Sequence, residues 1–160
     1  NFAKAYVRRL RAEVLLDLIN SVTDSPDKYS GIPLGSRAVE IVDGNTSTYF
    51  LTTFGRSKRG SVCSCEVTVD PNLSQALHLL NGTTVNTKVS RAKWLQKLIK
   101  DKAKPEDVVN EIYWRCLSRP ATNKELSKLQ EFLEDPKELS NSYYDIFWAV
   151  MNSKEFFFNH

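Results

Sequence analysis

Apolar residues recur at intervals of three and four along most of the chain, and this helical spacing restricts the fold more than any other feature. An amphipathic helix is predicted over residues 8–24, where the apolar side chains follow this spacing. Further helices are predicted over residues 73–82, 84–104, 105–119, 122–133 and 143–157. We therefore expect one mainly α domain of about five to six helices, spanning residues 1–160.

Residues 30–70 interrupt the helical pattern. Five of the six glycines fall between Gly31 and Gly60, around short apolar pieces at residues 38–42 and 49–51. These pieces are predicted to be short strands or extended segments joined by turns. Long irregular segments inside a helical domain often carry function, so we expect a site within residues 44–70.

Composition narrows the classes of function. No stretch approaches the roughly 18 apolar residues of a membrane-spanning helix, so no membrane span is expected. The formal charge of +3 is too small to indicate nucleic acid as a partner. The chain begins with Asn1-Phe2-Ala3-Lys4, without an initiator Met or the features of a secretory signal. We expect a mature chain or, preferably, a fragment of a longer protein.

The most unusual segment is 54–66, in which three cations precede two cysteines. Cys63 and Cys65 form a Cys-x-Cys pair downstream of Arg56, Lys58 and Arg59. Nearby cations favour the thiolate form, which makes both cysteines candidate catalytic residues. The alternative is a solvated basic loop with two incidental thiols.

Four further side chains complete the candidate site. Arg56, Arg59 and Glu66 are candidates for anion or interdomain contacts, because cations between glycines can bind a carboxylate, sulfate or phosphate. His78 could serve the thiol pair as a base, although a lone histidine on such a helix is more often a core-edge residue bonded to a neighbouring loop. A metal site built from the cysteines, Glu66 and His78 is the least favoured hypothesis, since the Cys-x-x-Cys pairs of zinc sites are absent. No metal is therefore expected.

Established catalytic signatures are missing from the sequence. It contains no Gly-x-Ser-x-Gly, no His-Glu-x-x-His, no phosphate-binding glycine loop and no Cys-x-x-Cys-His for haem attachment. These absences disfavour a self-contained enzyme. Cys116 stands alone in a helical context and is predicted to be a small core residue.

Five ordered stretches of the sequence resemble one known family. They are RRLRAEVLLD at 8–17, GSRA at 35–38, FGR and CSCE within 54–66, LSQALHLLN at 73–81, and WAVMNSKEF at 148–156. In these stretches the chain resembles the C-terminal domain called DUF1553. It departs from the family pattern at Ser57, where proline is expected, and at Val67, where a basic residue is expected.

The resemblance implies a place for this chain in a larger protein. Such domains form the C-terminal part of exported proteins of planctomycetes and related bacteria, in a periplasmic or extracellular setting. Those proteins often carry a cytochrome-c-like domain and a DUF1549 domain, so any haem would belong to a separate domain and no cofactor is expected in this chain. In an oxidising compartment a Cys63–Cys65 disulfide becomes a stronger option.

Two functions compete on these grounds. The preferred one is a non-catalytic helical module that docks on other domains of the same polypeptide or binds a carbohydrate or anionic partner. This hypothesis predicts that Cys63, Cys65 and Arg56 are structural and hold the irregular region of residues 30–70 against the helices. The alternative is part of an enzyme or redox unit that uses Cys63 and Cys65 with Arg56, Arg59 and His78.

Overall fold

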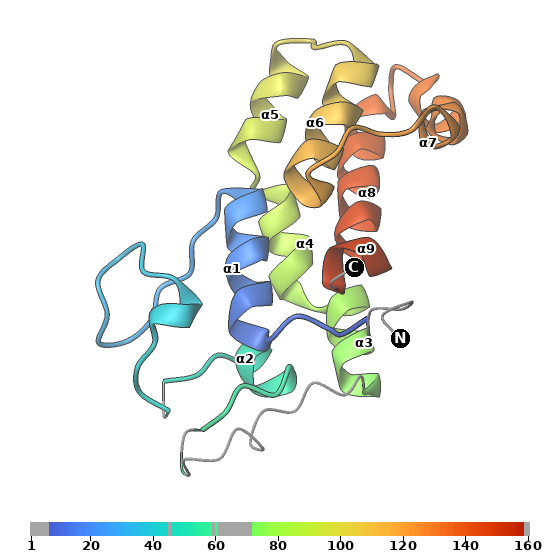
Figure 1. Cartoon of the computed structure of the whole chain (residues 1–160). Coiled ribbons are helices and arrows are strands. Elements are labelled where there is room, and N and C mark those ends of the chain that lie inside the picture. The colour runs from blue at the N-terminus through green and yellow to red at the C-terminus, as the bar shows by residue number, and fades with distance from the viewer. Residues whose placement is uncertain (1–6, 45, 59, 61–71, 159–160) are drawn as a thin grey trace.

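The chain folds into a bundle of short helices, seen in a computed structural model that describes residues 7–44, 46–58, 60 and 72–158 (Figure 1). The α-helices are α1 (Ala12–Thr23), α2 (Tyr49–Thr53), α3 (Leu73–Asn81), α4 (Thr83–Ser90), α5 (Lys93–Lys100), α6 (Pro105–Leu117), α7 (Asn123–Leu129), α8 (Leu139–Met151) and α9 (Lys154–Phe157). The described residues also form the 3-10 helices η1 (Ala38–Glu40) and η3 (Gln130–Leu133). The mainly α fold is confirmed, in more and shorter pieces than expected. Among the described residues, no helix has both the length and the apolar character needed to cross a bilayer.

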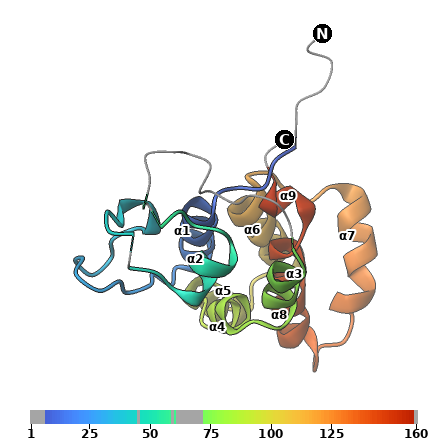
Figure 2. The same ribbon diagram turned by 90° about the horizontal axis from the view of Figure 1, so that it is seen from below.

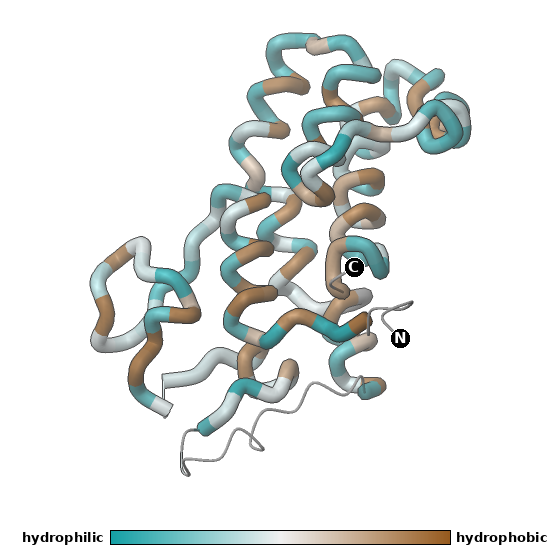
Figure 3. Tube along the Cα trace, viewed as in Figure 1, coloured by the Kyte–Doolittle hydropathy of each residue, from teal (hydrophilic) through white to brown (hydrophobic). Residues whose placement is uncertain are grey.

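The core lies where four helices meet. α4 packs against both α1 and α8, and α6 packs against α8 on the other side (Figure 1). Fully buried apolar side chains face this junction, and the tube in Figure 3 shows the apolar stretches of α1 and α8 along it. Examples are Leu15 and Ile19 on α1, Val85 on α4, Ile112 on α6 and Phe147 on α8. Burial of such side chains is the main source of stability in a fold of this kind.

Two long predicted helices are each broken into two. The helix predicted over 84–104 ends at Ser90, because the backbone of buried Ala92 is extended (φ −62°, ψ 99°). The break turns α5 so that the indole Nε1 of Trp94 donates a 2.9 Å hydrogen bond to the main-chain oxygen of Val22 at the end of α1. The helix predicted over 143–157 is broken before Ser153, whose hydroxyl accepts from the amide of Phe156 and caps α9.

The short strands predicted within residues 30–70 are not found at the described positions. Residues 38–40 form η1 and residues 49–53 form α2. The reason is local, because the carboxylate of Asp17 on α1 accepts the amides of Ala38 at 2.5 Å and Val39 at 3.1 Å. Amides that are satisfied in this way need no neighbouring strand. The segment between α1 and α2 therefore forms a wide excursion beside the bundle (Figure 1).

The first and last described residues lie together. The amide of Leu10 donates a 3.0 Å hydrogen bond to the oxygen of Phe157, and Arg9 forms an isolated antiparallel bridge with Phe158. The segment before α1 thus runs beside α9 (Figure 2). Because residues 9 and 10 are used in this pairing, the first helix begins at Ala12 and not at residue 8 as predicted.

Candidate functional site

The sequence-predicted site is only partly visible. Cys63, Cys65, Arg59 and Glu66 lie outside the described residues. Arg56 and His78 are described, and both are buried. Within the described part of the chain, no cluster of three or more His, Cys, Asp or Glu side chains could hold a metal ion.

Arg56 holds the irregular region together from inside. Its guanidinium donates to the main-chain oxygens of Ile41 and Asp43, each at 3.0 Å, and to that of Thr46. Its Nε lies 3.6 Å from a carboxylate oxygen of Glu13 on α1. The side chain is 2% exposed, so these contacts occupy the guanidinium within the domain. This is the structural role that the module hypothesis expects of Arg56.

His78 lies in an aromatic enclosure at the corner of α2, α3 and α4. Its ring packs against Tyr49, Phe50 and Phe54, with centroid separations of 5.1, 5.6 and 6.1 Å. Its Nε2 lies 3.1 Å from the hydroxyl oxygen of Thr84 on α4. Burial lowers the pKa of His78 below its usual value, because the charged form is desolvated there.

Gly82 closes the same corner from the other side. An added Cβ at Gly82 would lie 2.8 Å from Nδ1 of His78 and 2.9 Å from its carbonyl carbon, so only glycine fits without a shift. The geometry supports the interpretation of His78 as a core-edge residue hydrogen-bonded to a neighbouring segment.

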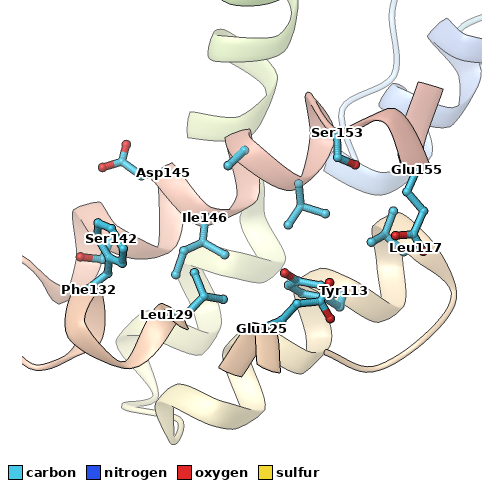
Figure 4. A pocket seen from close by; sticks show the side chains of 12 residues that line it. Tyr113, Leu117, Glu125, Leu129, Phe132, Ser142, Asp145, Ile146, Ser153 and Glu155 are labelled. Carbon is cyan, nitrogen blue, oxygen red and sulfur yellow. The ribbon is translucent and has the colours of Figure 1, made fainter. Parts of the chain in front are cut away.

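A different surface has the features of a binding site. An apolar groove of about 430 Å³ runs between α6, α7 and α8 (Figure 4). This volume falls within the range of about 300–1,000 Å³ that is usual for ligand sites. Its apolar walls come from Tyr113, Leu117, Leu129, Phe132, Ile146, Ala149 and Val150. Phe132 is 64% exposed at the edge, which leaves a large aromatic ring in water.

One end of the groove is closed by a charged cluster. Arg119 binds both carboxylate oxygens of Glu125 at 3.0 Å and both oxygens of Glu155 at 2.7 Å. The Arg119 hydrogen bonds lower the pKa of Glu125 to about 2, and those from Glu155 and Glu125 raise the pKa of Arg119. The pKa of Tyr113, whose ring lies 5.5 Å from the guanidinium, is raised mainly by burial. Both carboxylates are thus hydrogen-bonded to one guanidinium, and the cluster keeps a net negative charge.

The other end of the groove carries a separate charge. Asp145 lies on the exposed side of α8 and lines the groove near Ser142 (Figure 4). The groove can thus accept apolar side chains along its length and a cation at one end. Leu129 and Phe132 fall within the helix predicted over 122–133, and periodicity does not show that they border an open groove.

Comparisons with known proteins give one match. A family model described as PSD1, protein of unknown function (DUF1553), matches residues 1–133. No curated protein and no solved structure matches the chain. The matched region contains α6, α7 and η3 from the groove walls, while α8 and α9 follow it.

Proposed function

The chain belongs to the DUF1553 family of proteins of unknown function. From the features of its surface we propose that it is a non-catalytic docking module. Its partner is another domain of the same polypeptide. The single observation that carries this proposal is the apolar groove between α6, α7 and α8, with Phe132 exposed at its edge. Exposed apolar surface of this kind is typical of a surface that another protein segment covers.

The chemistry of the groove points to an amphipathic helix as the occupant. Leu129, Ile146 and Val150 provide apolar walls for side chains spaced along one helix face. Asp145 places a carboxylate near one end, where a lysine or arginine of the incoming helix would pair with it. The Arg119 cluster at the other end has one cation and two carboxylates, so it keeps a net negative charge and does not oppose a cationic partner.

The module is favoured over an enzyme or redox unit by the two candidate residues that are described. The guanidinium of Arg56 donates hydrogen bonds to main-chain oxygens of its own domain. His78 is enclosed by aromatic rings, and burial lowers its pKa. Neither arrangement supports an anion clamp or an accessible base. The proposed cysteine chemistry of Cys63 and Cys65 stays a prediction, which a thiol count on native protein would test.

The cellular setting is proposed from the family resemblance alone. An exported polypeptide, periplasmic or extracellular, would give the docking module its partner domains, and any haem would reside in one of them. Detection of the intact polypeptide in the cytoplasm of its native host, and not in the envelope or medium, would contradict this setting.

The docking test uses the isolated chain and the remaining part of its polypeptide, expressed separately. Titration calorimetry should detect a complex, and Ala149→Trp, which fills the groove from an exposed position, should weaken it at least tenfold. The matched control is Trp114→Ala, which removes an exposed aromatic ring outside the groove lining and should leave affinity unchanged. No complex with the wild-type chain, or equal affinity for Ala149→Trp, would refute the docking function.

Hydrogen exchange gives a second readout. Amides of α7 and α8 should exchange more slowly in the full polypeptide than in the isolated chain, because a docked helix covers the groove. The amides of α5, whose residues do not line the groove, should show no such difference and serve as the internal control.

A further inference from the structure

A second cavity, of about 400 Å³, has a very different chemistry from the groove. It lies between α4, the start of α2 and the turn that follows α1. Its walls combine apolar surface with hydroxyl and charged groups, which come from Tyr49, Asp27, Thr83, Thr87, Lys88 and Arg91. None of its described lining residues also lines the apolar groove, so the two sites can be tested independently.

One face of α4 supplies most of the polar wall. Thr83, Thr87 and Arg91 follow one another at intervals of four residues, which places them in a row along the helix. Gly82 caps this helix without a side chain, so no side-chain oxygen satisfies the amides of the first turn. Thr83, at the start of α4, and Arg91, its C-cap, thus lie at opposite ends of the helix, and Arg91 is the cation of this wall.

An ion pair in the wall of the cavity determines the net charge of its lining. Lys88 is buried, and its Nζ lies 2.7 Å from both the oxygen of Ser25 and a carboxylate oxygen of Asp27. This pair is internally neutral. Exposed Arg91 therefore leaves the cavity with a net positive charge among its described lining residues.

An aromatic ring stands at the edge of the cavity. Tyr49 is 70% exposed, and its ring lies tilted against buried His78, with 5.1 Å between the ring centroids. Since Thr84, which also lines the cavity, is the hydrogen-bond partner of His78, the histidine supports two parts of the wall. A supported, solvent-facing aromatic ring beside hydroxyls and a cation suits a ligand that is apolar on one face and polar at its edges.

From this arrangement we propose that the cavity binds an acidic sugar unit, one that carries a carboxylate or a sulfate ester. Arg91 binds the anionic group in a charge-assisted, bidentate manner, and Tyr49 packs against the apolar face of the sugar ring. Thr83 and Thr87 accept or donate hydrogen bonds to ring hydroxyls. Glycosidic hydrolysis is not part of the proposal, because among the described lining residues the one carboxylate, that of Asp27, is bound to Lys88 and such hydrolysis uses two.

The test is a titration of the 160-residue chain, followed by NMR or calorimetry, with four probes. They are a galacturonic acid trisaccharide, a sulfated galactan oligosaccharide of similar length, the neutral galactose trisaccharide, and inorganic sulfate. At least one of the two acidic sugars should bind at least tenfold more tightly than both the neutral sugar and sulfate. The one that binds identifies the source of the negative charge.

Matched variants assign the binding to the cavity. Arg91→Ala and Tyr49→Ala should each weaken binding of the acidic sugar at least tenfold, and because both side chains are exposed the fold should be preserved. Arg37→Ala and Trp114→Ala remove an exposed cation and an exposed aromatic ring elsewhere and should have no effect. Failure of both acidic sugars to bind, equal binding of the neutral sugar, equal binding of sulfate, or full binding by Arg91→Ala would each overturn the proposal.

Discussion

Arg56 and Glu13 face each other inside the domain, with 3.6 Å between Nε and the nearest carboxylate oxygen. Arg56 follows α2 and Glu13 lies in the first turn of α1, so the contact links the irregular region to the central bundle. The three main-chain oxygens that the same guanidinium binds come from residues 41–46. One side chain thus organises a long segment that has no regular ladder of hydrogen bonds.

Replacing Arg56 by lysine should destabilise the domain by about 2–4 kcal/mol, because a single ammonium group cannot reach the same set of oxygens and leaves buried acceptors unpaired. Urea unfolding measures the loss. The matched control is Arg37→Lys, at an exposed ion pair with Glu40, which should change stability by less than about 0.5 kcal/mol. Equal effects of the two substitutions would contradict the assignment of Arg56 as the organising residue.

Gly82→Ala should cost about 1–3 kcal/mol, since the added methyl group meets the main chain and ring of His78. The adjacent exposed residue provides the control, because Thr83→Ala adds no such contact and should change stability by less than about 0.5 kcal/mol. Thermal unfolding followed by circular dichroism compares them. Wild-type stability of Gly82→Ala would show that the corner between α3 and α4 is more adaptable than its geometry implies.

The stability contributed by Glu125 should depend on pH. Its pKa is lowered to about 2 in the folded state by Arg119, so the contribution is complete above the ordinary carboxyl pKa and is lost as pH falls from about 4.5 towards 2. Glu125→Gln should therefore lower the free energy of unfolding by about 1 kcal/mol at pH 7, and by less at pH 3, because the pair is partly exposed.

A matched variant separates this effect from the general effect of acid. Glu111→Gln removes the exposed pair with Arg115 and should cost no more than about 0.5 kcal/mol at pH 7. Urea unfolding at both pH values measures all three proteins. A difference between wild type and Glu125→Gln that stays the same at pH 3 would argue against the Arg119 pairing as its source.

Cys116 should be chemically silent in the folded protein. Burial raises the pKa of its thiol to about 12, so almost no thiolate exists at pH 8. In a variant with Cys63→Ser and Cys65→Ser, the remaining thiol should react with an aromatic disulfide reagent on the order of a hundredfold more slowly than in urea. Rapid reaction of the native variant would place Cys116 in an open environment.

Helix boundaries with local chemical causes could be predicted from the sequence. Thr122 and Glu125 have the spacing of a capping box and form one, with the hydroxyl of Thr122 accepting the amide of Glu125. The helix predicted over 105–119 begins at Pro105 and buries Val108, Ile112 and Tyr113, which recur at helical spacing. These features depend on residues within one or two helical turns, which is the range over which a sequence pattern is informative.

The orientation of α3 could not be predicted in that way. Its pattern favours burial of Leu73 and Leu77, yet these are 74% and 50% exposed, while Gln75 and His78 are buried. Gln75 donates a 3.2 Å hydrogen bond to the oxygen of Thr53, and His78 bonds to Thr84. The helix turns its polar face inward because both polar side chains find partners there, and such partners come from distant parts of the chain.

The apolar groove and the polar cavity could not be predicted from the sequence for a related reason. Arg56 is a candidate because of its place in the glycine-rich region of the sequence. The groove instead depends on the distance between Leu129 and Ile146 in the folded domain. The polar cavity depends on the approach of Asp27 to Lys88, two residues with no sequence relationship. Spacing along the chain reports on one helix face and carries no information about the distance between two helices.

The bridge between Arg9 and Phe158 gives the domain a mechanical property. If the domain is pulled through the segments that contain Arg9 and Phe158, the force first acts on this bridge and on the adjoining hydrogen bond from Leu10 to Phe157. The helices are stretched only afterwards. The same proximity makes circular permutation feasible, because a short linker could join the segments at Arg9 and Phe158 and new ends could be opened in an exposed turn such as residues 134–137. In such a permuted protein the helices would pack against the same neighbours, but a pulling force would enter the domain at the new ends.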